Sequence, residues 1–153
     1  MEKEAVFLEQ DLAKATTRDK PPTWLIACHH RPAYSSGKSG PNQGVQKLWV
    51  PIYDKYHVNL VLNGHDHQYE STHPMRGGKV MSSTADGTTY LVVGGAGAFL
   101  NPDKAITYGN PWTLTYEAAY SYVTVDVSPK SLRVNAYRQD RSQLEPKQIV
   151  ITK

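Results

Sequence analysis

Two short stretches decide the fold of this chain. The first is Thr23-Trp-Leu-Ile-Ala-Cys-His29, which continues into His30. The second is Val58-Asn-Leu-Val-Leu-Asn63, followed by Gly64-His65-Asp66-His67. Each is a brief continuous apolar run, typical of a strand with both faces covered. Because a helical stripe over residues 45–56 lies between them, we expect strand, helix, strand with a parallel crossover.

The rest of the chain is predicted to hold one more helix and several strands. An amphipathic pattern predicts a helix over residues 4–15, and Pro51 predicts a kink or late start in the helix at 45–56. The stretch 99–118, which carries Tyr108, is expected to be irregular. Mostly antiparallel strands are predicted after the crossover, at residues 88–93, 123–127, 132–136 and 148–152.

Length and composition exclude several classes of protein. The chain has 153 residues, 39% of them apolar, which predicts one domain over residues 1–153. No apolar run reaches the ~18 residues of a membrane span, and no signal peptide is expected. The net charge of +3 comes from dispersed residues, which argues against nucleic-acid binding. Cys28 is the only cysteine, so no intrachain disulfide is possible, and we expect a buried, inert thiol.

Histidines are the informative candidates for chemistry. His29 and His30 follow the first predicted strand, and His65 and His67 follow the second. Ligands bind at the carboxyl ends of strands in open α/β sheets, so the two groups should converge there. Imidazoles in this arrangement suit zinc, iron or manganese, and two ions about 3.5–4 Å apart are usual in hydrolases. Spacing alone does not decide between His29 and His30, and a lone histidine at a strand end is commonly a surface residue.

Three motifs resemble those of the purple acid phosphatases, which are calcineurin-like metallophosphoesterases. They are the run from Trp24 through His30-Arg31-Pro32 to Ser36, the run Gly64-His65-Asp66-His67-Gln68-Tyr69-Glu70, and Tyr90 to Gly97. The resemblance implies an α/β (α+β) fold, with this chain as the C-terminal half of an αββα sandwich. It implies that His30, rather than His29, shares one metal ion with His65, while His67 binds the other. Tyr69 and Glu70 would orient these histidines.

The chain also departs from the family pattern. The earlier motifs that supply aspartate, tyrosine and asparagine ligands are absent, Ser71 stands where arginine is usual, and residues 35–46 hold no histidine. The resemblance therefore implies the histidine half of a two-metal phosphate-ester hydrolase, with His30, His65 and His67 as catalytic metal ligands. Alone, the chain should hold at most one ion of iron, zinc or manganese.

The resemblance also suggests partners and a location. An N-terminal half of the domain should complete the site, and without it exposed strand edges should favour self-association. A compartment outside the cytoplasm, or one like the lysosome, is implied by the family. Two alternatives remain: a non-catalytic binding or scaffold protein with the same fold, and a zinc-binding structural fragment.

Overall fold

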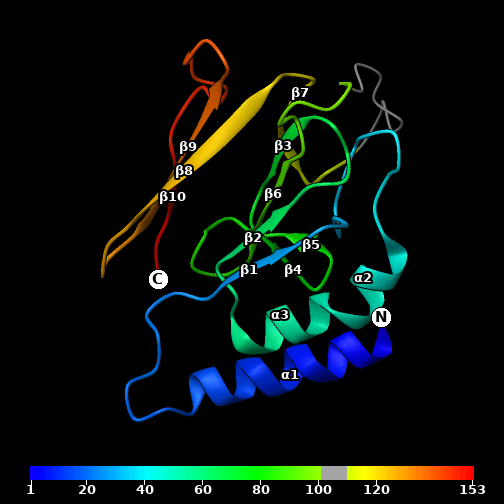
Figure 1. The fold of residues 1–153 in the computed structure, drawn as a ribbon. Helices are drawn as coiled ribbons and strands as arrows, with labels where there is room; N and C mark the ends of the chain where they lie inside the picture. The colour runs from blue at the N-terminus through cyan, green and yellow to red at the C-terminus, as the bar shows by residue number, and fades with distance from the viewer. Residues whose placement is uncertain (101–109) are drawn as a thin grey trace.

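The computed structural model describes residues 1–100 and 110–153 (Figure 1). The helix expected at 4–15 is α1, Glu2–Thr16. The helix expected at 45–56 is divided at Trp49 into α2, Gln43–Leu48, and α3, Val50–Tyr56. Pro51 lies in the first turn of α3, where its missing N–H costs nothing. The proline thus starts a new helix, one of the two outcomes that the sequence predicts.

A mixed five-stranded sheet forms the centre of the molecule. Its strands run in the order β1-β2-β6-β3-β7. β1 pairs with β2 and β2 pairs with β6 in parallel, while β3 pairs antiparallel with β6 and β7. The predicted parallel crossover from β1 through the helices to β2 is confirmed. The bounds of these strands are Ile26–His29 (β1), Leu60–Asn63 (β2), Tyr69–Thr72 (β3), Thr89–Val93 (β6) and Thr113–Glu117 (β7).

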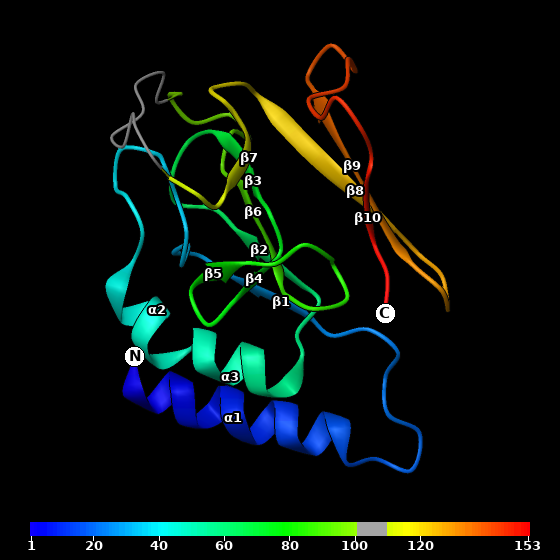
Figure 2. The ribbon, with the colours of Figure 1, turned by 180° about the vertical axis from the view of Figure 1, so that it is seen from behind.

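Helices and a second sheet cover opposite faces of the central sheet (Figure 2). Val61 and Tyr90 face Tyr53 of α3, with α1 outside it, whereas Leu60 and Leu91 face Leu132 of the second sheet. This alternation follows from the two-residue period of a strand. The second sheet is antiparallel and contains β8, Ser121–Val127, β9, Leu132–Arg138, and β10, Ile149–Ile151. A small hairpin joins β4, Met75–Arg76, to β5, Lys79–Val80.

Two sequence predictions about local structure are wrong. The stretch expected to be irregular contains β7, because its residues pair with β3, a long-range contact that local pattern does not reveal. Tyr108 of the same stretch lies outside the described residues. β1 is not covered on both faces: Ile26 is 44% exposed and Cys28 is exposed. The cause is position, since β1 is an edge strand that the second sheet does not reach.

Buried tyrosines on the helix side predict alkaline unfolding. The Tyr34 ring packs 4.9 Å from Tyr90, and burial raises the pKa of Tyr34 to about 12 and that of Tyr53 above its usual value. Unfolded tyrosines ionise near pH 10. The free energy of unfolding should therefore be unaffected by these groups below pH ~10 and fall as pH rises above it. Urea titrations between pH 8 and 11.5 measure this, and Tyr34→Phe should make the fall shallower. An unchanged pH dependence in that variant would contradict it.

Candidate metal centre

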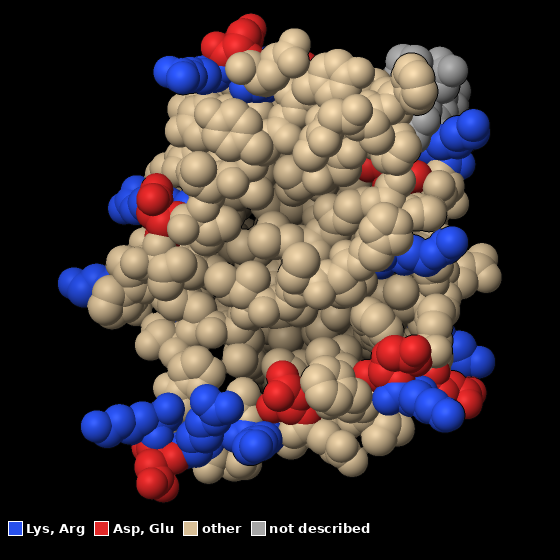
Figure 3. Space-filling model, in the orientation of Figure 1, with Lys and Arg blue, Asp and Glu red and all other residues tan. Residues whose placement is uncertain are grey.

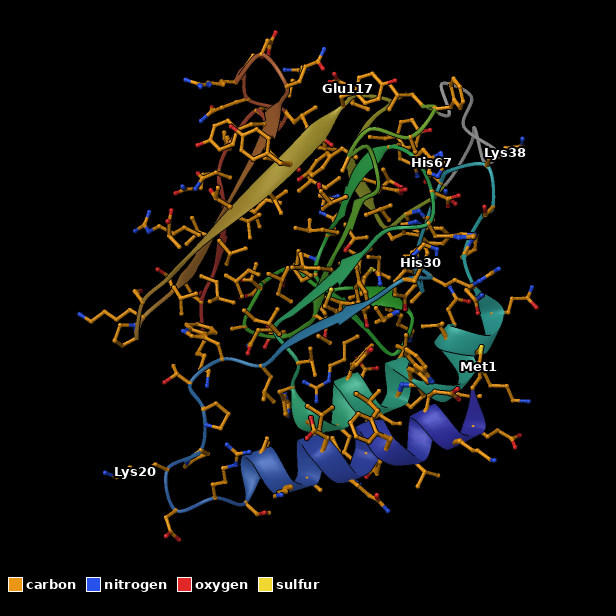
Figure 4. The ribbon with its side chains drawn as sticks, viewed as in Figure 1. Met1, Lys20, His30, Lys38, His67 and Glu117 are labelled. Atoms are coloured by element: carbon orange, nitrogen blue, oxygen red, sulfur yellow. The ribbon has the colours of Figure 1, made fainter. Side chains whose placement is uncertain are left out.

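The predicted ligands His30 and His65 lie against each other at the carboxyl edge of the sheet. β1 and β2 end in register, with His29 opposite Asn63, so the next residues leave the sheet side by side. His30 Nε2 is 3.1 Å from His65 Nδ1, and the ring centroids are 5.0 Å apart. Figure 4 shows His30 and His67 at this same end of the molecule. The topology of two parallel strands is therefore what brings the histidines together.

The separation of the two imidazole nitrogens suits a shared metal ion. Zinc–nitrogen bonds are about 2.0–2.1 Å long, and two ligands at a tetrahedral angle then lie about 3.3 Å apart. The observed 3.1 Å is close to that value. Partial burial and the positive charge of Arg31 lower the pKa of His65, which favours the neutral imidazole that binds metals. The two residues present thus fit one ion without a large movement.

His67 is placed differently from this pair. Its Nδ1 donates a hydrogen bond of 2.7 Å to the Phe99 carbonyl oxygen, which leaves Nε2 as the acceptor nitrogen. A metal-binding histidine commonly has its second nitrogen held in this way. Within residues 1–100 and 110–153, no three histidine, cysteine or acidic side chains gather to hold a single ion. The described site is therefore a pair of imidazoles with a third pointing elsewhere.

The His29 side chain lies on the face of the sheet opposite to His30 and packs against the helices. Its ring contacts Trp49 and Tyr53, with centroids 4.8 and 6.0 Å away, and the side-chain amide of Asn63 lies 3.2 Å from its Nδ1. Burial lowers the pKa of His29 to about 4, so it stays neutral near pH 7. Sequence spacing does not distinguish His29 from His30. In the folded chain, strand alternation places their side chains on opposite faces.

The turn that carries His65 and His67 has a demanding backbone. His65 has a φ of 67°, in the left-handed region that non-glycine residues seldom adopt. Gly94, at the end of β6, lies so close that an added Cβ would be 1.9 Å from the Asp66 carbonyl oxygen. Only glycine fits there, so the end of β6 packs directly on the histidine turn.

A buried polar network lies beneath this turn. Glu70 is fully buried and accepts hydrogen bonds from the Ser36 N–H, the Ser36 hydroxyl and the Thr113 hydroxyl, at 2.7, 2.8 and 2.8 Å. Asp66, also fully buried, accepts from the Ser35 hydroxyl and the Ser39 N–H. The Asp66 carboxylate therefore holds the loop that follows His30 against the turn of His65 and His67, whereas Glu70 holds that loop against β3 and β7.

Tyr69 and Glu70, which the resemblance assigns to orienting the histidines, form hydrogen bonds with neighbours in the buried interior. The Tyr69 hydroxyl donates to buried Glu145 at 2.7 Å, and Glu70 binds Ser36 and Thr113. Sequence reasoning missed Asp66 and Ser35 altogether. The available signal was a carboxylate placed between two histidines, since an acidic residue in a tight turn usually caps backbone N–H groups.

An apolar groove of about 490 Å³ borders the histidine pair. It is lined by His29 and His30, by Gly64, and by residues of β1, β2, β6 and β8, namely Cys28, Leu62, Asn63, Val93 and Val123. Figure 3 shows Lys, Arg, Asp and Glu side chains mostly around the rim of this face and an uncharged centre. The open face of β1 is thus continuous with the edge that carries the histidines.

Comparison with known proteins shows which families this chain resembles. The family model for calcineurin-like phosphoesterases matches residues 2–69. An uncharacterised protein of Mycobacterium tuberculosis H37Rv is 34% identical over 122 residues, which are 69% of this chain and 22% of that protein. Probable inactive purple acid phosphatase 24 of Arabidopsis thaliana is 31% identical over 151 residues, 87% of this chain and 23% of that one. The chain is a relative of the purple acid phosphatases.

The fold agrees with this relationship. The purple acid phosphatase from yellow lupin superposes with a TM-score of 0.78 and 23% identity, over 98% of this chain and 28% of the lupin chain. The predicted α/β fold of the metallophosphoesterases is thereby confirmed. Human acid phosphatase type 7 is 26% identical, and the matched part is 32% of its length. Across these proteins, the chain corresponds to less than a third of the purple acid phosphatase relatives' length. No helix in its described part is long and apolar enough to cross a membrane.

Proposed function

We propose that this chain supplies the histidine part of a two-metal site that hydrolyses phosphate esters. His30 and His65 hold one ion and His67 binds the other, with iron, zinc or manganese as the metals. Two bound ions supply electrostatic stabilisation of the phosphoryl group. The residues of this chain hold the ions and, through the loop after His30, shape one wall of the site. The observation that carries the proposal is the 3.1 Å approach of His30 Nε2 to His65 Nδ1.

The remaining ligands are proposed to come from the rest of a longer domain. The described residues offer two imidazoles to one ion, whereas structural and catalytic zinc sites use at least three protein ligands. The uncharged groove beside His30 and the open face of β1 are the surfaces that such a segment would cover. By analogy with acid phosphatases among the relatives, we propose a location outside the cytoplasm.

A non-catalytic protein of the same fold is the competing proposal. Two Arabidopsis relatives are named probable inactive purple acid phosphatases. A structural neighbour with a TM-score of 0.77 is described as the GAP50 anchor in the inner membrane complex of Plasmodium. In this chain His30, His65 and His67 are all present and the first two are correctly spaced for an ion. The same 3.1 Å separation also fits a hydrogen bond between the two imidazoles, so metal binding is the property that distinguishes the two proposals.

Metal binding by matched histidine variants tests the proposal. We expect the purified chain to bind at most one Zn²⁺ per molecule. His30→Ala should weaken binding at least tenfold, whereas His29→Ala should cost stability with little loss of affinity, because His29 faces the core. Isothermal titration calorimetry gives the affinity, and thermal unfolding of the metal-free variants separates the two effects. Equal losses of affinity in both variants, a larger loss at His29, or two tightly held ions per chain would overturn the assignment.

A further inference from the structure

We infer that Asp66 and Ser35 are positioning residues that set the directions of the His65 and His67 side chains. Neither touches an ion in this arrangement; they act on the backbone that carries the ligands. The inference rests on the proposed function, because it concerns the geometry of the same site. It adds a hydrogen-bonded link between two loops that are 31 residues apart in sequence.

The Asp66 carboxylate is fully buried and bridges the two loops. One oxygen, Oδ2, accepts the Ser35 hydroxyl at 2.5 Å, and the other, Oδ1, accepts the Ser39 N–H at 3.1 Å. Asp66 is fully buried, whereas His65 and His67 on either side of it are partly exposed. By holding the Asp66 side chain in place, these hydrogen bonds fix the orientation of the turn that carries His65 and His67.

The hydrogen-bond pattern around Ser35 requires a carboxylate at position 66. The Ser35 oxygen already accepts from the Gly37 N–H at 3.0 Å and from Gln68 Nε2 at 3.2 Å. A hydroxyl has two acceptor sites and one hydrogen, so its hydrogen must go to Asp66. An asparagine here would turn its amide nitrogen, a donor, toward either the Ser35 hydroxyl or the Ser39 N–H, so one of the two hydrogen bonds would be lost. Aspartate can therefore bind both donors, whereas asparagine, which has the same shape, cannot.

The hydrogen bond between Asp66 and Ser35 affects the histidines because the backbone of their turn is strained. His65 holds a left-handed φ of 67°, a conformation that persists only when the surroundings enforce it. The Asp66 side chain anchors the turn to Ser35, and the Gly94 backbone packs against the Asp66 carbonyl oxygen. If the carboxylate is lost, the turn can relax and His65 moves away from His30. Supporting residues of this kind usually change metal affinity by 10- to 100-fold.

Three variants test the link, with Co²⁺ as a spectroscopic probe. Asp66→Asn and Ser35→Ala remove it, and Ser36→Ala is the matched control. Ser36 is the adjacent residue, is equally buried and donates to a different carboxylate, that of Glu70, so its loss costs stability without touching the turn. We expect the first two variants to bind Co²⁺ about 10- to 100-fold more weakly with an altered visible spectrum. Ser36→Ala should keep the wild-type affinity and spectrum at comparable thermal stability.

A metal-free measurement tests the same link independently. In the apo chain, nuclear Overhauser contacts between the His30 and His65 rings should be present in the wild type and Ser36→Ala. They should be lost in Asp66→Asn and Ser35→Ala. If Asp66→Asn keeps both the ring contact and the Co²⁺ affinity, the inference is wrong. If the wild type fails to bind Co²⁺ but shows the expected pattern of ring contacts, the positioning role stands and the proposed metal site fails.

Discussion

Residues 1–153 loaded with iron and zinc should show no phosphatase turnover above that of the metal salts alone. The described part of the chain brings two imidazoles to one ion and no carboxylate beside them, so it cannot hold two ions at a fixed separation. Supplying the N-terminal part of the domain on a second chain should raise the rate by about 10²-fold or more. Hydrolysis of a chromogenic phosphate ester measures both rates.

The control for this complementation is the same mixture made with His65→Ala. In this variant His30 no longer has the His65 imidazole beside it. The added segment should therefore still bind the chain but restore little activity. Strong turnover by residues 1–153 alone would show that the site is complete in this chain. Equal activity with wild-type and His65→Ala chains would mean that these histidines have no part in the reaction.

Gly94→Ala should be among the most destabilising single substitutions in the chain, at about 3 kcal/mol or more. The added Cβ would lie 1.9 Å from the backbone carbonyl oxygen of Asp66, and backbone atoms cannot move aside as a flexible side chain can. The strain falls on the histidine turn, so Zn²⁺ affinity should fall together with the free energy of unfolding. Urea denaturation followed by circular dichroism measures the stability change.

Gly64→Ala is the matched control for this substitution. Gly64 belongs to the Gly-His-x-His motif, yet its nearest neighbour to an added Cβ is His30 Nδ1 at 3.6 Å, an ordinary contact. We therefore expect a loss of less than about 1 kcal/mol in the free energy of unfolding. A larger loss at Gly64 than at Gly94 would contradict the packing of β6 against the turn.

The difference between these two glycines shows how far sequence reasoning reaches. Gly64 is conspicuous because it stands beside two histidines, whereas Gly94 is one of several glycines in a run 30 residues later. Nothing local marks Gly94 as the constrained one. Its restriction arises from the parallel pairing of β6 with β2, which places the end of β6 over residues 64–67.

Local pattern did determine the elements whose signal lies within a few residues. The apolar period of α1, the two short apolar strands and the alternation over residues 122–127 all predict the correct type of element. These signals survive because each element buries one face against its neighbours, and the period records that face. The parallel crossover then follows from the length of the connection and places the two histidine groups at one edge.

Tertiary structure alone decided three matters. It showed that His29 packs against the helices while His30 meets His65, a difference that spacing does not reveal and that only the family resemblance had suggested. It also left Cys28 exposed. Sequence pattern did not reveal this, because an apolar strand at the edge of a sheet has the same pattern as one at its centre. It also joined Asp66 to Ser35, 31 residues apart. Residue types and local period determine which groups are available, whereas contacts between distant segments determine which of them meet.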